Sequence, residues 1–167
     1  MLRDHASIVR FVAQAQGITG RKKLQKMMYI AKKLGYPVHE KYEFHMYGPY
    51  SEELTARIEE LCTMGFLSEQ KEDKGAYTQY TYQTTPESSA FMELVPPLTD
   101  SFSTCIEEMK HKSSRFLELV ATLFYFDDLE RDAQIDKVHI VKGKLNFTDE
   151  EFEEAFGFIE SLKQNNC

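Results

Sequence analysis

Apolar residues recur at helical spacing in three stretches of the first 65 residues. Each stretch places them on one face, as an amphipathic helix packed on a core requires. The predicted helices and their apolar faces are residues 4–16 with Ile8, Phe11, Val12 and Ala15, residues 20–34 with Leu24, Met27, Met28, Ala31 and Leu34, and residues 51–64 with Leu54, Ile58, Leu61 and Cys62. Thr19 and Ser51 suit the N-caps of the second and third helices, and Gly65 suits the end of the third.

The pattern then changes to one that favours strands. Residues 66–67 begin a first strand, and residues 71–75 (KEDKG) form a charged turn. Residues 77–83 are rich in the aromatic and β-branched side chains that suit a sheet. Three helices followed by a hairpin is the order of elements in a winged helix-turn-helix, so residues 1–95 are predicted to form such a domain.

A pair of prolines at residues 96–97 marks the predicted domain boundary, because consecutive prolines continue neither a helix nor a sheet. Residues 98–167 are predicted to form an α-helical domain or extension packed on the first. Within it, residues 116–126 (FLELVATLFYF) are apolar nearly all round, which indicates a central helix. Thr148 and Glu151 form a capping box at the start of the last helix. The predicted fold class is mostly α with a small β-hairpin wing.

The composition is that of an ordinary globular protein, since 42% of the 167 residues are hydrophobic and 28% are charged. No stretch has the roughly 18 uncharged apolar residues of a membrane span. The N-terminal residues become amphipathic where a signal peptide would be apolar. We therefore expect a cytoplasmic protein without a membrane partner.

Basic residues are concentrated in the second predicted helix. Residues 21–33 hold six lysines and arginines and no acid, although the whole chain has a formal charge of −7. Arg21, Lys22 and Lys23 lie in the first turn, where each positive charge opposes the helix dipole by about 0.3–1 kcal/mol, and Lys26 follows one turn later. We interpret these four residues as a patch that binds phosphates or an acidic protein surface. The alternatives are an ordinary solvated face and pairing with the acidic C-terminal half.

The charges elsewhere disfavour the usual way in which a winged helix reads DNA. The predicted recognition helix, residues 51–64, holds one arginine and four glutamates, a net charge of −3, and the wing residues 69–74 have a net charge of −1. DNA phosphates would repel both elements. A protein partner is therefore favoured. The alternative is a DNA-binding transcriptional regulator whose basic helix contacts phosphates and whose C-terminal helices form a homodimer.

Aromatic residues surround a predicted turn at Gly48-Pro49. Three alternating side chains before it are typical of a strand packed on helices: Tyr42, Phe44 and Met46. Tyr47 and Tyr50 flank the turn and are candidates for partner contact, because tyrosine combines apolar area with a hydroxyl group. Gly48 and Pro49 are expected to set the angle into the next helix.

No familiar catalytic or ligand-binding motif is present in the sequence. His39 and His45 share a segment with two glutamates, but no CxxC or HExxH accompanies them. Cys62 lies on an apolar helix face, where an unreactive thiol is expected. No glycine-rich phosphate loop follows a strand. We therefore predict a protein that is not an enzyme and has no catalytic residue, metal or cofactor.

Two neighbouring segments, KLQKMMYIAKKLGYPV and FHMYGPYSEEL, form a recognisable pattern within residues 23–54. The pattern resembles the Panacea domain, also called SocA-like, of many antitoxins from bacterial and phage toxin–antitoxin pairs. The matching positions are Lys23, Leu24, Lys26, Tyr29, Tyr47, Gly48, Pro49 and Leu54. The whole chain is also similar to the YwgA family of uncharacterised bacterial proteins, in the segments KKLQKMMYIAKKL and EKYEFHMYGPYSEEL. The Panacea resemblance implies that the chain binds and neutralises a toxin protein without catalysis.

Overall fold

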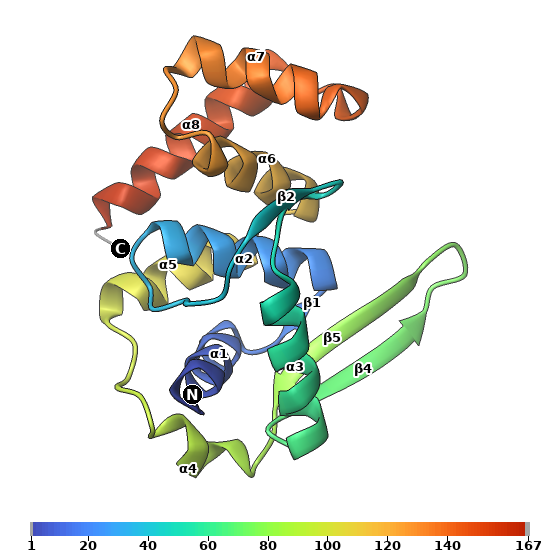
Figure 1. The fold of residues 1–167 in the computed structure, drawn as a ribbon, viewed down its shortest axis with the longest axis vertical. Helices are drawn as coiled ribbons and strands as arrows, with labels where there is room; N and C mark the ends of the chain where they lie inside the picture. Colours follow the sequence, from blue (N-terminus) through green and yellow to red (C-terminus); the bar gives the residue numbers. More distant parts are fainter. Residues whose placement is uncertain (1, 166–167) are drawn as a thin grey trace.

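The computed structural model describes residues 2–165, which are mostly helical and include two small antiparallel sheets (Figure 1). The predicted mostly α composition with a β-hairpin is confirmed. The three helices predicted in the N-terminal part are present as α1 (Leu2–Ala15), α2 (Arg21–Lys33) and α3 (Glu52–Met64). Their predicted apolar faces are buried, except that Cys62 is partly exposed.

Interactions between neighbouring residues set both ends of α3, whereas pairing with a distant strand decides where α2 begins. Ser51 caps α3 as predicted, since its Oγ accepts a hydrogen bond from the Leu54 amide at 3.0 Å. Gly65 ends α3 in the left-handed conformation, as predicted. The prediction that Thr19 caps α2 is wrong, because Thr19 lies in the short strand β1 (Ile18–Thr19) and Gly20 is the N-cap.

The larger sheet has the strand order β1-β5-β4 and is antiparallel throughout. Its main part is the predicted hairpin, formed by β4 (Leu67–Asp73) and β5 (Thr78–Thr84). The turn predicted at residues 71–75 is misplaced, because residues 71–73 pair with β5 and the turn follows them. β1 joins β5 with Ile18 opposite Tyr82 and Thr19 opposite Thr81, so Thr19 belongs to the sheet and α2 begins only after Gly20. The hairpin projects beyond the helices in Figure 1, and its outer half is exposed.

The C-terminal half is helical, and α6 is central to it. After the short helix α4 (Ser88–Met92), the elements are α5 (Asp100–Lys110), α6 (Ser114–Tyr125), α7 (Arg131–Val141), the 3-10 turn η1 (Gly143–Leu145) and α8 (Asp149–Gln164). α6 is buried from Leu117 to Phe124 and contacts both α2 and α8, as expected for a helix that is apolar nearly all round. One apolar core runs through both halves of the chain. The predicted capping box at Thr148 and Glu151 is present.

A second, two-stranded sheet lies over α2 and α6. It consists of β2 (Glu43–His45) and β3 (Gly48–Tyr50), with Phe44 opposite Pro49. Phe44 packs on Tyr125 of α6 at 5.1 Å between ring centroids, so the predicted packing on helices is confirmed for that residue. It is wrong for Met46, which is 80% exposed because it lies in the turn between the strands.

None of the helices within residues 2–165 is both long enough and apolar enough to cross a membrane.

Candidate functional site

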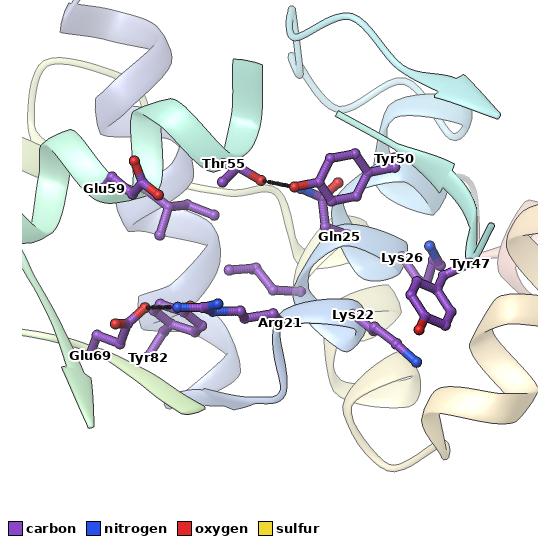
Figure 2. Close-up of a pocket in the computed structure, with 12 residues that line it drawn as sticks. Arg21, Lys22, Gln25, Lys26, Tyr47, Tyr50, Thr55, Glu59, Glu69 and Tyr82 are labelled. Carbon is purple, nitrogen blue, oxygen red and sulfur yellow. Dashed lines mark hydrogen bonds and ion pairs between the residues drawn. The ribbon is translucent and has the colours of Figure 1, made fainter. Parts of the chain in front are cut away.

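A pocket of about 220 Å³ opens between α2, α3 and the β4–β5 hairpin. Figure 2 shows the charged and aromatic side chains that surround it. Five of the six residues predicted to contact a partner line this pocket: Arg21, Lys22, Lys26, Tyr47 and Tyr50. The tertiary structure therefore brings together side chains from the basic helix and the Gly48-Pro49 turn, which were selected from separate sequence patterns.

Arg21 fastens α2 to the hairpin. Its Nε donates a hydrogen bond to the Tyr82 hydroxyl at 3.1 Å, and that hydroxyl donates to a Glu69 carboxylate oxygen at 2.6 Å. The guanidinium group also lies 3.7 Å from the centroid of the Tyr80 ring. Burial and the hydrogen bond to Glu69 raise the pKa of Tyr82 above its usual range. The charge of Arg21 is thus already compensated by Glu69, whose carboxylate lies 3.6 Å from the guanidinium group.

Lys22 and Tyr47 form an exposed pair at the edge of the pocket. The Lys22 ammonium lies 3.5 Å from the centroid of the Tyr47 ring, close enough for a cation–π interaction. Tyr47 is 48% exposed, so part of it remains accessible to a partner. No carboxylate of residues 2–165 forms an ion pair with Lys22 at this position.

Lys23 does not reach the pocket. Its Nζ donates a hydrogen bond to the backbone carbonyl of Lys110 at 2.5 Å, at the end of α5. Burial, and to a smaller extent the nearby Lys110, lower the pKa of Lys23. Among the predicted contact residues, Lys23 therefore connects α2 to the C-terminal half.

Lys26 lines the inner side of the pocket but offers no charge to the surface, which corrects the expectation of a surface patch that includes it. The residue is 1% exposed, and its Nζ donates a hydrogen bond to the Pro49 carbonyl at 2.9 Å. Burial lowers the pKa of Lys26 to about 8, against the opposing effect of Glu118. Lys26 thus holds the Gly48-Pro49 turn against α2. The two segments of the pattern, KLQK and YGP, therefore contact each other in the fold.

A buried ion pair in the C-terminal half supports the same turn. Lys142, which follows α7, lies 3.2 Å from the Glu118 carboxylate of α6, and its Nζ also donates to the Met46 carbonyl. The carbonyls of Met46 and Pro49, on either side of Tyr47 and Gly48, are therefore each bound by a buried lysine. Neither Glu118 nor Lys142 was predicted as part of the site. The sequence does contain a signal for Glu118, because it is the only charged residue in the apolar run FLELVATLFYF.

Gly48 has a close approach to α6 that a side chain would disturb. Its φ angle is +85°, and a Cβ atom there would lie 3.4 Å from the Thr122 hydroxyl and 3.7 Å from the Glu118 side chain. The other predicted structural positions, Leu24, Tyr29, Pro49 and Leu54, are buried as well.

Gln25, which no sequence pattern singled out, fixes the start of α3 against α2. Its side-chain amide donates to the Ser51 carbonyl and accepts from the Ser51 amide, both at 2.9 Å. The Tyr50 hydroxyl forms a 2.9 Å hydrogen bond with the Thr55 hydroxyl at the upper edge of the pocket in Figure 2. Tyr50 is half-buried, so it contributes a wall to the pocket more than an open surface.

The exposed surface of α3 is more acidic than its sequence indicates. Arg57, the only basic residue of this helix, turns away and pairs with the buried Glu40 carboxylate at 2.6 Å and with Asp4 at 3.7 Å. Burial raises the pKa of Glu40 although Arg57 lowers it. The exposed charged side chains of α3 are all glutamates: Glu52, Glu53, Glu59 and Glu60.

The residues considered for catalysis or metal binding lie apart. His39 contacts Asp4 at 2.7 Å, whereas His45 contacts Glu43 at 3.6 Å. Within residues 2–165, no three histidine, cysteine or acidic side chains are arranged to hold a metal ion. Burial raises the pKa of the free Cys62 thiol, which keeps it in the less reactive protonated form.

The sequence comparisons identify a relative of nearly the same length. No protein-family model matches the chain, so the resemblance of residues 23–54 to the Panacea domain is unconfirmed. The chain is 51% identical over 164 residues to the uncharacterised protein YwgA of Bacillus subtilis strain 168, a match that covers 98% of this chain and 99% of the relative. The chain therefore belongs to the YwgA family.

Proposed function

We propose that this protein is a non-catalytic protein-binding module, antitoxin-like or adaptor-like, and that its partner contacts the pocket between α2, α3 and the β4–β5 hairpin. We further propose that residues 1–95 form a winged helix-turn-helix domain. The order α1, β1, α2, α3, β4, β5 and the strand order β1-β5-β4 support this assignment.

The pocket itself is the observation that carries the proposal. Its volume of about 220 Å³ is below the roughly 300–1,000 Å³ of pockets that enclose small-molecule ligands. A space of this size suits a single anchoring side chain from a protein partner. Its walls contain tyrosine and arginine, the residue types that are enriched where protein interfaces derive most of their affinity.

The charge distribution supports a protein partner over DNA. The α3 helix presents four glutamates, and its arginine is paired within the fold. The adjoining hairpin carries the exposed Glu69, Glu72 and Asp73 against the exposed Lys71 and Lys74, a net charge of −1. DNA binding depends on basic side chains that neutralise phosphates, and these two elements would repel them.

The proposal can be tested by affinity capture from a lysate of the source organism, with quantitative mass spectrometry. Lys22→Ala/Tyr47→Ala removes the exposed pair at the pocket. Lys144→Ala/Tyr77→Ala is the matched control, because it removes the same two residue types from exposed positions outside the pocket. We expect the pocket variant to recover a specific partner at least about tenfold less well than the wild type, as loss of a hot-spot residue does, and the control to recover it normally.

Equal capture by the pocket variant and the wild type would exclude this surface. A separate titration with duplex DNA tests the competing function. Sub-micromolar binding with a steep dependence on salt would contradict the proposal, because it would require a basic surface engaged with phosphates.

A further inference from the structure

Two charged side chains at the pocket are not neutralised by the fold, and they lie at opposite sides of it. Figure 2 shows Glu59, from α3, on one side and Lys22, from α2, on the other. Both residues are exposed. Within residues 2–165, Glu59 forms no hydrogen bond or ion pair, and the Lys22 ammonium forms none either, its one favourable polar interaction there being with the Tyr47 ring.

The other charged groups of the pocket, and most of its neutral polar groups, already have partners. Arg21 is bound to Tyr82 and Glu69, and the Gln25 amide is bound to the Ser51 backbone. The hydroxyl groups of Tyr50 and Thr55 bind each other, and Lys26 binds the Pro49 carbonyl. These pairings leave Glu59 and Lys22 as the charges that an incoming ligand can satisfy.

Most of the pocket surface is apolar. Leu24 of α2 and Ile58 of α3 contribute aliphatic side chains, and Tyr47 and Tyr50 contribute aromatic carbons. Burying an apolar side chain against such a surface is favourable because it removes apolar area from water. The pocket therefore combines an apolar centre with a negative charge on one side and a positive charge on the other.

We propose that the pocket receives one large apolar side chain of the partner, flanked by a basic residue that pairs with Glu59 and an acidic residue that pairs with Lys22. This inference rests on the proposed function and specifies the chemistry of the partner. The apolar side chain supplies most of the affinity, and the two charges fix the direction in which the partner segment crosses the pocket. Complementary charges at the edge of an interface act mainly on specificity and orientation in this way.

A selection from a displayed library of random peptides, each about 12 residues long, tests the inference without knowledge of the natural partner. The library is selected on the wild-type protein and, separately, on the charge-exchanged variant Lys22→Glu/Glu59→Lys. We expect the wild type to enrich peptides with an apolar residue between a basic and an acidic residue. We expect the charge-exchanged variant to enrich the two charges in the opposite order.

A synthetic peptide from the wild-type selection then gives a quantitative test. Its affinity should fall at least about tenfold on the charge-exchanged variant and recover when the two charges of the peptide are exchanged as well, as the interaction between paired sites in a double-mutant cycle requires. The matched control is Lys144→Glu/Glu150→Lys, which exchanges two exposed charges outside the pocket and should leave the affinity unchanged. Thermal denaturation of all variants checks that each remains folded.

The outcomes separate this inference from the proposed function. Peptides that lose binding on the Lys22→Ala/Tyr47→Ala variant but show no charge order would overturn the inference and leave the pocket as the partner site. A selection that enriches no pocket-dependent peptide would also overturn the inference. The proposed function is judged separately, by the capture experiment.

Discussion

Replacing the buried Lys26 by methionine should remove a rise in stability that the wild-type protein shows in mildly alkaline solution. The Lys26 pKa is lowered from 10.5 to about 8, chiefly by burial. Each pKa unit corresponds to about 1.4 kcal/mol, so the charged form of Lys26 destabilises the fold by about 3 kcal/mol near pH 7. Methionine has a similar length, carries no charge and leaves the Glu118–Lys142 ion pair in place.

The sign of the pH dependence follows from proton binding. Between pH 8 and 10.5 the unfolded chain keeps the Lys26 proton while the folded chain loses it, so the free energy of unfolding rises with pH in that window. From about pH 7 to about pH 9.5, the expected gain from this group is about 2 kcal/mol. At higher pH, tyrosines such as Tyr29 and Tyr36, whose pKa values are raised by burial, act in the opposite direction.

The assay is urea denaturation of the wild type and Lys26→Met at several pH values in this range, followed by circular dichroism. The variant should lack the rise of about 2 kcal/mol. Near pH 7 it should lie within about 2 kcal/mol of the wild type, because the relieved charge is offset by the unsatisfied Pro49 carbonyl. Parallel pH profiles for the two proteins would refute the assignment of this titration to Lys26.

Three further predictions concern stability and can be measured by denaturation. Glu118→Gln should lower the free energy of unfolding by about 3–5 kcal/mol, because it leaves buried ammonium groups without their carboxylate. Adding Lys142→Met should restore part of the loss, and purely additive losses would contradict this coupling. Gly48→Ala should lower the free energy of unfolding more than Gly65→Ala does, although both glycines have φ +85°. A Cβ at position 48 meets a hydroxyl group of α6 at 3.4 Å, whereas a Cβ at position 65 meets nothing within 4 Å, and equal losses would argue against this close approach. Ser51→Ala should lower the free energy of unfolding by about 1 kcal/mol through loss of the α3 cap, and an unchanged stability would mean that the cap contributes nothing.

Local patterns in the sequence were sufficient to predict α1, α2, α3, α6, the start of α8 and the long hairpin. The apolar faces of α1, α2 and α3 are spaced so that only a helix buries them together. Ser51 and Thr148 cap their helices through amide groups three residues away, so the interaction is contained in a few neighbouring residues. Thr19 shows the limit of such reasoning, because pairing with the distant strand β5 decides its conformation.

Locating the candidate site required both the sequence pattern and the tertiary structure. The sequence selected Lys22 and Lys26 as equivalent charges one helical turn apart on α2. The tertiary structure separates them, because the β2–β3 turn and α6 cover Lys26 and leave Lys22 exposed beside Tyr47. A lysine is placed inside or outside a protein by the groups that approach it from elsewhere in the chain, here the Pro49 carbonyl and Glu118. Helical spacing in the sequence predicts which residues share a face of a helix, whereas long-range packing decides which of them a partner can reach.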